Sequence, residues 1–248
     1  FDPATGKVLA YDETCGHPYW SVGGEDAGSG PHPAPLPEAS KSLTVSMSLA
    51  QGDSNTWSGE GYFRGLSQFS HYGEVRSDED LRGGYVARLA SSVLAGGEAT
   101  AAVPVLLENY AVEISFAVDV AAPEPDAAGR KVIVIGHPAG GLLDRLPGDV
   151  HLFQESRQSP VLGMENWRQT VIVRLEVPEE QLLHSPSPKN LTNQAGTFSL
   201  AVEYKEGWLT LTRTISLAGE PLGPTDWPAL RALLLEEDDA GNGTLMLD

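Results

Sequence analysis

The sequence predicts a mainly β protein, β-sandwich-like and antiparallel, with two β-rich domains that each carry about one helix. The clearest support is the stretch 197–217, in which apolar and polar residues alternate on both sides of a turn at Lys205–Gly207. The stretch 43–64 repeats the pattern around a polar turn at Gln51–Asn55. A period of two is that of a strand with one dry face and one wet face, so each stretch predicts a β-hairpin.

Further segments also predict strands: 99–107, 112–120, 131–135, 171–177 and 244–247. The first contains Pro104, which has no N–H to donate and therefore favours an edge position in a sheet. In the second, Glu113, Ser115 and Asp119 occupy alternate positions that suit a wet face.

Two segments depart from this alternation and predict helices. The segment 77–94 has apolar residues at every fourth position: Leu81, Tyr85, Leu89 and Val93. Ser77 and Asp80 are spaced as a capping box at its start. Two glycines in its interior weaken the helix prediction. The segment 228–236 begins with a proline, and Thr225 or Asp226 precedes it as a cap.

Composition divides the chain into four parts. Residues 1–40 are rich in Gly, Pro, Asp and Ser and predict a lead-in or linker, and 41–121 forms a first β-rich domain. Residues 122–129 contain two prolines and no apolar side chain larger than alanine, which indicates a linker before a second β-rich domain at 130–248. Because the chain starts at Phe1, we expect a processed product or a piece of a longer protein.

Charge and cysteine content exclude several classes of function. The chain has 34 acidic and 16 basic residues, and its net charge of -18 repels nucleic acids and anionic membranes. An apolar run of about 18 residues, long enough to span a bilayer, does not occur. Cys15 is the only cysteine, so an intrachain disulfide and a cysteine-based zinc site are both excluded. Ligand and oligomeric state stay open.

The segment 131–141, KVIVIGHPAGG, is the nearest approach to a catalytic motif. A strand that runs into a glycine-rich turn is typical of the nucleophile elbow of α/β-hydrolases, in which a serine stands between the glycines. Here Pro138 stands in the serine's place and supplies no nucleophile. We therefore interpret this segment as a strand followed by a β-turn.

Histidines and the cysteine give no further catalytic or metal motif. Cys15 and His17 lie two residues apart, without a third group to orient the imidazole as a base. The six histidines, at 17, 32, 71, 137, 151 and 184, show no spacing typical of metal ligands.

Charged and aromatic residues also have structural interpretations. The acidic residues 78–80 suit the first turn of a helix. The acidic segment 236–243 resembles a calcium loop but lacks the closing glutamate, so we interpret that segment as a solvated loop. Arg213 interrupts the dry register of its strand; it either snorkels at the sheet end or pairs with a carboxylate of a neighbouring element. The tryptophans predict core or turn packing; they are Trp20, Trp57, Trp167, Trp208 and Trp227.

Several segments of the second half form a recognisable series: Arg157–Val161, Val171–Val177 followed by Pro178, Gly196–Phe198, Leu209–Arg213 and Trp227–Pro228. The earlier portion adds Phe1–Gly6, Leu36–Ala39 and Leu43–Leu49. Together they resemble the region downstream of the catalytic domain in large bacterial transglutaminase-like proteins, relatives of cysteine proteases with flanking β-rich domains of unknown function. The resemblance implies an extracytoplasmic location, periplasmic or in the cell envelope. It carries no catalytic role, because no segment here matches the family's series of cysteine, histidine and carboxylate.

The leading hypothesis is a non-catalytic C-terminal module that positions or extends an upstream transglutaminase-like domain or binds another protein. It assigns no catalytic, cofactor-binding or metal-binding residue. Two alternatives remain open. One is an enzyme, either a hydrolase with dispersed carboxylates or a cysteine peptidase dependent on Cys15 or His137. The other is a glycan-binding, lectin-like sandwich, which predicts a row of exposed tryptophans on one face.

Overall fold

The computed structural model describes the following residues: 18–20, 31–33, 41–52, 56–66, 75, 78–107, 111–146, 148, 150–161, 163–219 and 222–248. Within the expected lead-in, two short strands, β1 (Pro18–Trp20) and β2 (Pro31–Pro33), pair antiparallel. The candidate pair Cys15 and His17 lies outside the described residues, as does His71.

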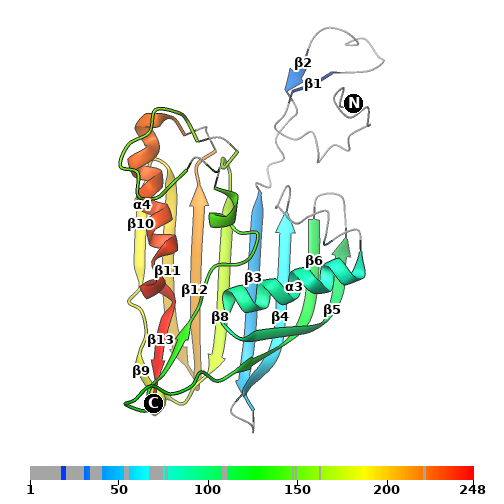
Figure 1. The fold of residues 1–248 in the computed structure, drawn as a ribbon, viewed down its shortest axis with the longest axis vertical. Coiled ribbons are helices and arrows are strands. Elements are labelled where there is room, and N and C mark those ends of the chain that lie inside the picture. Colours follow the sequence, from blue (N-terminus) through cyan, green and yellow to red (C-terminus); the bar gives the residue numbers. More distant parts are fainter. Residues whose placement is uncertain are drawn as a thin grey trace.

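An eight-stranded sheet forms the body of the molecule, in the order β10-β11-β12-β8-β3-β4-β6-β5 (Figure 1). The mainly β prediction is confirmed, and both expected hairpins are present as β3–β4 and β11–β12. The strands are β3 (Ser42–Gln51), β4 (Thr56–Leu66), β5 (Gly97–Leu107), β6 (Ala111–Ala121), β8 (Arg168–Glu176), β10 (Lys189–Asn193), β11 (Gly196–Lys205) and β12 (Trp208–Leu217).

One strand pair differs from the antiparallel prediction. β3 and β8 run parallel, with Val45 opposite Val171 and Met47 opposite Val173. Parallel neighbours need a long connection, and these two are joined by more than a hundred residues that include all of β4 to β7. Each strand uses its other edge for an antiparallel partner, β4 for β3 and β12 for β8. The parallel pair therefore joins the two halves of the chain.

The division into domains at 122–129 stays a prediction. Strands from both sides of this segment hydrogen bond in one sheet, and their apolar side chains belong to one continuous core. Residues 126–130 themselves form a turn, in which Asp126 accepts hydrogen bonds from the backbone N–H groups of Ala128 and Arg130. Arg130 also pairs with Asp126 through its guanidinium group.

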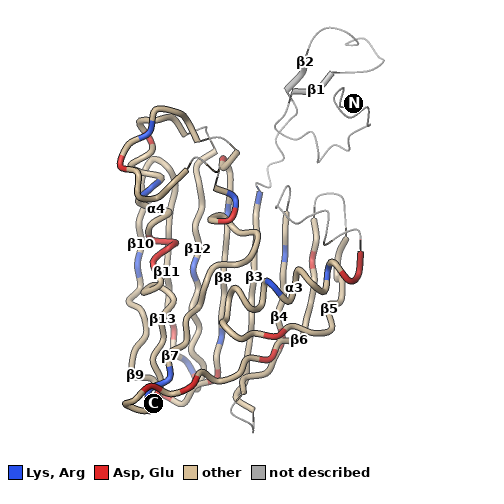
Figure 2. Tube along the Cα trace, viewed as in Figure 1, with Lys and Arg blue, Asp and Glu red and all other residues tan. Residues whose placement is uncertain are grey.

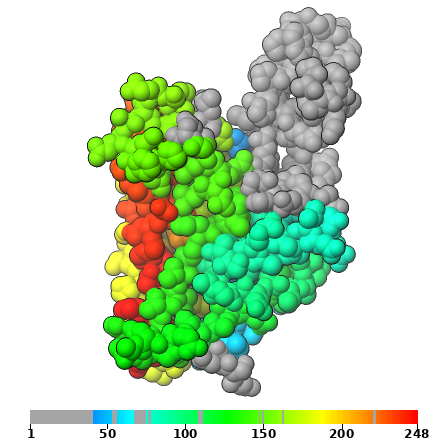
Figure 3. Space-filling model, in the orientation of Figure 1, coloured from blue at the N-terminus to red at the C-terminus, as the bar shows by residue number. Residues whose placement is uncertain are grey.

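A second layer covers one face of the main sheet (Figures 1 and 3). Helix α3 lies over the β3–β5 side, helix α4 lies over the β10–β12 side, and a small sheet of order β7-β13-β9 completes the layer. Their bounds are α3 (Glu79–Val93), α4 (Trp227–Asp238), β7 (Lys131–Val134), β13 (Thr244–Leu247) and β9 (Leu182–His184). Short 3-10 turns are η1 (Leu143–Arg145), η2 (Glu179–Gln181), η3 (Pro224–Asp226) and η4 (Ala240–Gly243).

Strand β3 illustrates how the sequence separates the two faces of the main sheet. Leu43, Val45, Met47 and Leu49 are buried beneath the second layer, whereas the residues between them point to the other face. Ser48, on that other face, is exposed. Within the described part of the chain this second face, called the open face below, has no covering layer (Figure 1).

Both predicted helices form. The cap of α3 differs from the one expected, whereas α4 has the expected Asp226 at its N-cap position. The Asp78 side chain caps α3 by accepting from the N–H groups of Asp80 and Leu81 at 2.8 and 3.1 Å, so the predicted capping box is wrong. Leu81 is 50% exposed, and Arg82 is buried in its place, with its Nε donating to the carbonyl of Val75. In Figure 2 the first turn of α3 is acidic, as the helix dipole favours.

The start of α4 is organised by a 3-10 turn rather than by a side-chain cap on the helix itself. A carboxylate oxygen of Asp226 accepts from the N–H of Gly223 at 2.9 Å and closes η3, and α4 follows directly at Trp227.

The edge position predicted from Pro104 is confirmed, because β5 is the last strand of the sheet.

We predict that the two halves unfold together. Met47→Ala removes a side chain that is 1% exposed and should cost about 2–5 kcal/mol, because a cavity remains in a core shared by both halves. Calorimetry should show one transition at a lower temperature, with equal calorimetric and van't Hoff enthalpies. The exposed substitution Ser58→Ala is the control and should change stability by less than about 0.5 kcal/mol. Two separate peaks, of which only one moves, would contradict a common core.

Candidate functional site

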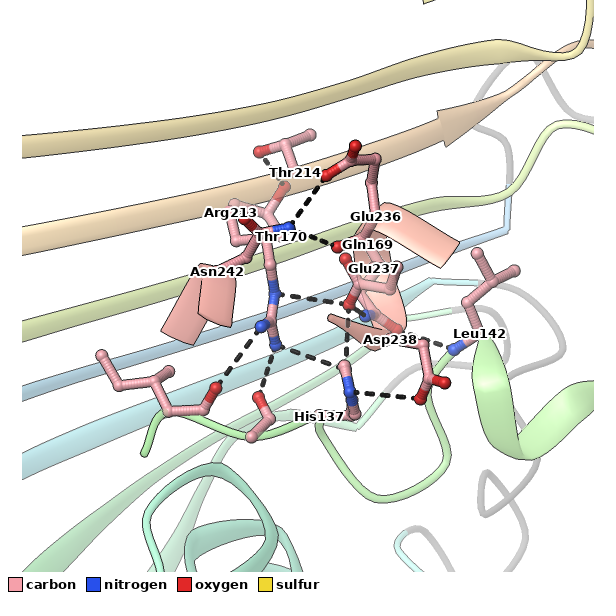
Figure 4. Close-up of polar contacts among 12 residues, drawn as sticks. His137, Leu142, Gln169, Thr170, Arg213, Thr214, Glu236, Glu237, Asp238 and Asn242 are labelled. Atoms are coloured by element: carbon pink, nitrogen blue, oxygen red, sulfur yellow. Dashed lines mark hydrogen bonds and ion pairs between the residues drawn. The ribbon is translucent and has the colours of Figure 1, made fainter. Parts of the chain in front are cut away.

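A buried polar cluster lies between the main sheet and its second layer (Figure 4). It is called the Arg213–Glu237 cluster and consists of Arg213 on β12, Glu237 on α4, Gln169 on β8 and His137 in the loop after β7. Arg213, Glu237 and Gln169 are 2%, 1% and 1% exposed. Charged groups rarely occur at such burial unless they are paired.

The guanidinium of Arg213 is surrounded by acceptors. Its Nε lies 3.4 Å from Oε1 of Glu237, its Nη1 donates to the carbonyl of Ile135, and its Nη2 donates to the carbonyl of Gly136. The ring of His137 also lies against it, with 3.4 Å between Nη2 and Nδ1. Of the two roles considered for Arg213, the structure shows the ion pair with a neighbouring element.

The carboxylate of Glu237 is the centre of the cluster. Its Oε1 accepts from Nε2 of Gln169 at 2.7 Å and lies 3.3 Å from Nδ1 of His137. The carbonyl oxygen of Gln169 in turn accepts from the N–H of Leu142 at 2.7 Å. The second oxygen of Glu237 is buried and accepts no hydrogen bond from the described residues.

The loop 135–142 connects the cluster to helix α3. Ala139 donates its N–H to the hydroxyl of Ser92 at 2.9 Å and accepts from the hydroxyl of Tyr85 at 3.0 Å. The N–H of Gly136 donates to the carbonyl of Val93. One short loop thus contacts α3 on one side and β8, β12 and α4 on the other.

The glycines of this loop allow its backbone to approach α3 and Gln169 closely. A Cβ on Gly136 would lie 2.3 Å from the carbonyl oxygen of Ser92, and one on Gly141 would lie 2.4 Å from the side-chain oxygen of Gln169. The N–H of Gly141 donates to the carbonyl of Pro138 at 2.9 Å. The β-turn interpretation of 138–141 is therefore confirmed.

The acidic segment 236–243 is only partly the solvated loop that was predicted. Its first residues complete α4, Glu237 turns inward, and Asp238 is exposed with Oδ1 3.9 Å from Nε2 of His137. Glu236 and Asp239 bind the amino group of Lys189 at 3.0 and 3.5 Å. The hydrogen bond to Glu236 raises the pKa of Lys189.

A metal-binding group is not found where the structure describes the chain: no set of three or more His, Cys, Asp or Glu side chains is arranged to hold an ion. The described histidines also lie apart, since the ring of His151 stacks on Phe153 while His184 belongs to β9. Packing explains Trp57, Trp167 and Trp227, which are 5%, 1% and 1% exposed. Trp208 lies beneath the guanidinium of Arg174 at 4.2 Å.

The chemistry of the cluster is that of a fixed ion pair. An imidazole beside a carboxylate has the arrangement of a general base and its orienting group. However, among the described residues His137 contacts Arg213, Glu237 and Asp238 rather than a hydroxyl or thiol group. Each contact joins two different elements, so the arrangement holds the layers together.

Sequence reasoning found Arg213 and missed its partners Glu237 and Gln169. A signal for Gln169 was present, because this polar residue occupies the dry register of β8 together with Val171, Val173 and Leu175. For Glu237 the surrounding run of acidic residues hid the one that turns inward.

Comparison with family models finds a match in the second half of the chain. Residues 145–247 match the model of a family described as a domain of unknown function with solved-structure structure (DUF3858). The matched segment, somewhat under half of the chain, contains Gln169, Arg213 and Glu237 but not His137. No curated protein matches the chain. Neither described helix has the length and apolar character needed to cross a membrane.

We predict that the Arg213–Glu237 pair acts as a unit in stability. Arg213→Met should destabilise the protein by about 3–5 kcal/mol, because it leaves the buried carboxylate of Glu237 without its counter-charge. The double variant Arg213→Met/Glu237→Leu should recover most of this loss, since no unpaired charge remains. Urea unfolding with a constant m-value measures both changes. A loss in the double variant equal to the sum of the losses of Arg213→Met and Glu237→Leu would show that the two side chains act independently.

Proposed function

We propose that this chain is a non-catalytic structural and protein-interaction module that stands next to a transglutaminase-like catalytic domain. The observation that carries the proposal is the Arg213–Glu237 cluster, in which the contacts that Arg213 and Glu237 make with the described residues fix one element against another. The match of 145–247 to a domain of unknown function is compatible with this role.

A clamped loop supports the interaction part of the proposal. The carbonyl of Leu152 accepts from Nε of Arg231, and the carbonyl of Gln154 accepts from Nε1 of Trp227, at 2.6 and 2.8 Å. Phe153 stands between these two anchored residues and is 79% exposed. The ring of His151 stacks on it, with 5.2 Å between ring centres.

The rigidity of this loop matters for binding. Burying an exposed aromatic ring contributes most when its backbone is already ordered, because little conformational entropy is then lost on association. Aromatic side chains of this kind dominate the binding energy of many interfaces. A protein partner is favoured over a nucleic acid or an anionic bilayer, since the chain has a net charge of -18.

The position of the loop is compatible with an upstream partner domain. It precedes β8, and β8 begins beside the start of β3, where the N–H of Arg168 donates to the carbonyl of Lys41 at 2.9 Å. The amino group of Lys41 also donates to the carbonyl of Gly163. Burial lowers the pKa of this lysine. The chain thus enters β3 beside the segment that leads from the Phe153 loop into β8, which is compatible with a partner domain upstream.

We predict that the isolated chain hydrolyses no peptide and transfers no acyl group. Continuous assays with a fluorogenic peptide library and with an amine-acceptor substrate should give the rate of the buffer alone. Cys15→Ala and His137→Ala should leave that background unchanged. If the wild-type chain is active and either variant is not, the chain is an enzyme that depends on Cys15 or His137, and the proposal of a non-catalytic module is wrong.

We also predict a role for Phe153 in binding the transglutaminase-like domain expected upstream in the same gene. With that domain expressed separately, Phe153→Ser should weaken binding about 30-fold, the effect of losing a hot-spot residue worth ~2 kcal/mol, without changing the urea midpoint. Isothermal calorimetry measures the affinity. Leu183→Ser, which alters another exposed apolar residue on β9, is the matched control. Equal affinity for wild type and Phe153→Ser would contradict this interface, and an upstream sequence without a Cys, His and Asp series would overturn the proposed context.

A further inference from the structure

The open face of the main sheet contains a hollow of about 610 Å³, called the open-face hollow. This volume lies in the range of small-molecule sites. Side chains from five neighbouring strands line it, among them Ser48, Glu60, Tyr62, Val103, Ile172 and Arg174. An antiparallel sheet commonly leaves one polar face in water, so a binding role needs support beyond exposure.

The first support is the shape of strand β5, which forms one wall. Its register with β6 shifts twice, between Thr100 and Val103 and between Pro104 and Leu106. Ala101 has a φ of 52°, a left-handed conformation that is costly for a residue other than glycine. Bulges and strained residues concentrate at functional sites, where they direct a strand or a side chain. Here they accompany a wall in which Val103 is 56% exposed.

The second support is a pair of opposite charges that do not neutralise each other. Glu60 on β4 and Arg174 on β8 are both in register with Ser48 on the strand between them. A carboxylate, a hydroxyl and a guanidinium therefore form one row across the floor of the hollow. Within the described ranges neither Glu60 nor Arg174 forms an ion pair, and Arg174 rests on the ring of Trp208.

The third support is an aromatic ring held in one orientation. The hydroxyl of Tyr62 donates to Oε2 of Glu113 at 2.5 Å, and Nε of Arg64 lies 3.0 Å from the other oxygen of that carboxylate. Burial, together with the Glu113 hydrogen bond, raises the pKa of Tyr62 to about 12. The phenol therefore stays neutral and fixed at physiological pH.

We propose that the open-face hollow is a binding site for a neutral saccharide. The C–H face of a sugar ring would lie on Tyr62, beside the apolar side chains of Ile172 and Val103. Its hydroxyl groups would donate to Glu60 and accept from Arg174, which are the charge-assisted hydrogen bonds that such a row offers. An anionic ligand is disfavoured, because the row carries one charge of each sign on a protein of net charge -18.

This inference does not depend on the proposed function, because its residues are remote from the Phe153 loop in sequence and belong to the open face. The proposed site also differs from the row of exposed tryptophans expected of a lectin-like sandwich, since Trp57, Trp167 and Trp227 are buried. A peptide is less suited than a sugar, because peptides commonly add to a sheet edge or enter a groove, whereas this site lies on a sheet face.

The test is a titration of the whole chain with neutral di- and trisaccharides of glucose, galactose and N-acetylglucosamine. Each sugar is used free and coupled to a carrier protein, because free oligosaccharides and glycoprotein glycans share this chemistry. Binding should be measured by calorimetry and by the change in intrinsic tryptophan fluorescence, to which Trp208 contributes through its contact with Arg174. We expect at least one sugar to bind with a Kd below about 1 mM, in both forms.

Variants assign the binding to the hollow. Glu60→Gln and Tyr62→Ala should each weaken the affinity at least tenfold, equivalent to ~1.4 kcal/mol. Glu124→Gln, which alters an exposed acid in the segment after β6 that does not line the hollow, and Phe153→Ser should leave the Kd unchanged. Far-UV circular dichroism and the urea midpoint report whether the variants are folded.

Three outcomes would overturn the proposal. The first is the absence of binding by every sugar up to about 10 mM, a concentration at which even weak sites are occupied. The second is binding that Glu60→Gln and Tyr62→Ala leave intact. The third is binding only of the coupled forms, which would mean that the chain recognises the carrier protein.

Discussion

The burial of the Arg213 guanidinium is the constraint on which the rest of the second layer depends. A charge removed from water needs a counter-charge and hydrogen-bond acceptors, and both must come from elements that are distant in sequence. Glu237 supplies the charge, and the carbonyls of Ile135 and Gly136 supply acceptors. The position of α4 and that of the loop after β7 are therefore linked, because neither can move without exposing or isolating a buried charge.

The same loop extends this constraint into the first half of the chain. It contacts α3 through Ser92, Tyr85 and Val93, while beneath it β3 and β8 pair in parallel. Two connections, one in each layer, thus bind segments that composition alone separates at 122–129. The loop and both helices lie on one face of the main sheet, so the opposite face is left for water or a ligand.

The extent to which this arrangement follows from the sequence depends on the range of the interaction. Alternation within a strand is local, so the hairpins β3–β4 and β11–β12 could be predicted from their own residues, and so could the edge position of β5 from Pro104. The parallel pairing of β3 with β8 has no local signal, because either strand would show the same pattern beside another neighbour. The partners of Arg213 were hidden for the same reason, although the polar Gln169 in a dry register marked one of them.

The exposed side chains to which we assign binding roles take no part in the Arg213–Glu237 cluster. Phe153 and the row of Glu60, Ser48 and Arg174 belong to elements fixed by other residues: the loop by α4, and the strands by their hydrogen-bonded neighbours. Fixing the backbone while leaving the side chain free lowers the entropy lost on binding. Natural proteins accept a strained residue such as Ala101 where the surrounding structure over-determines it, and here its neighbours Thr100 and Val103 pair with β6 on either side of the register shift. The same long-range contacts therefore make the core rigid and hold surface side chains in positions where they can bind a ligand.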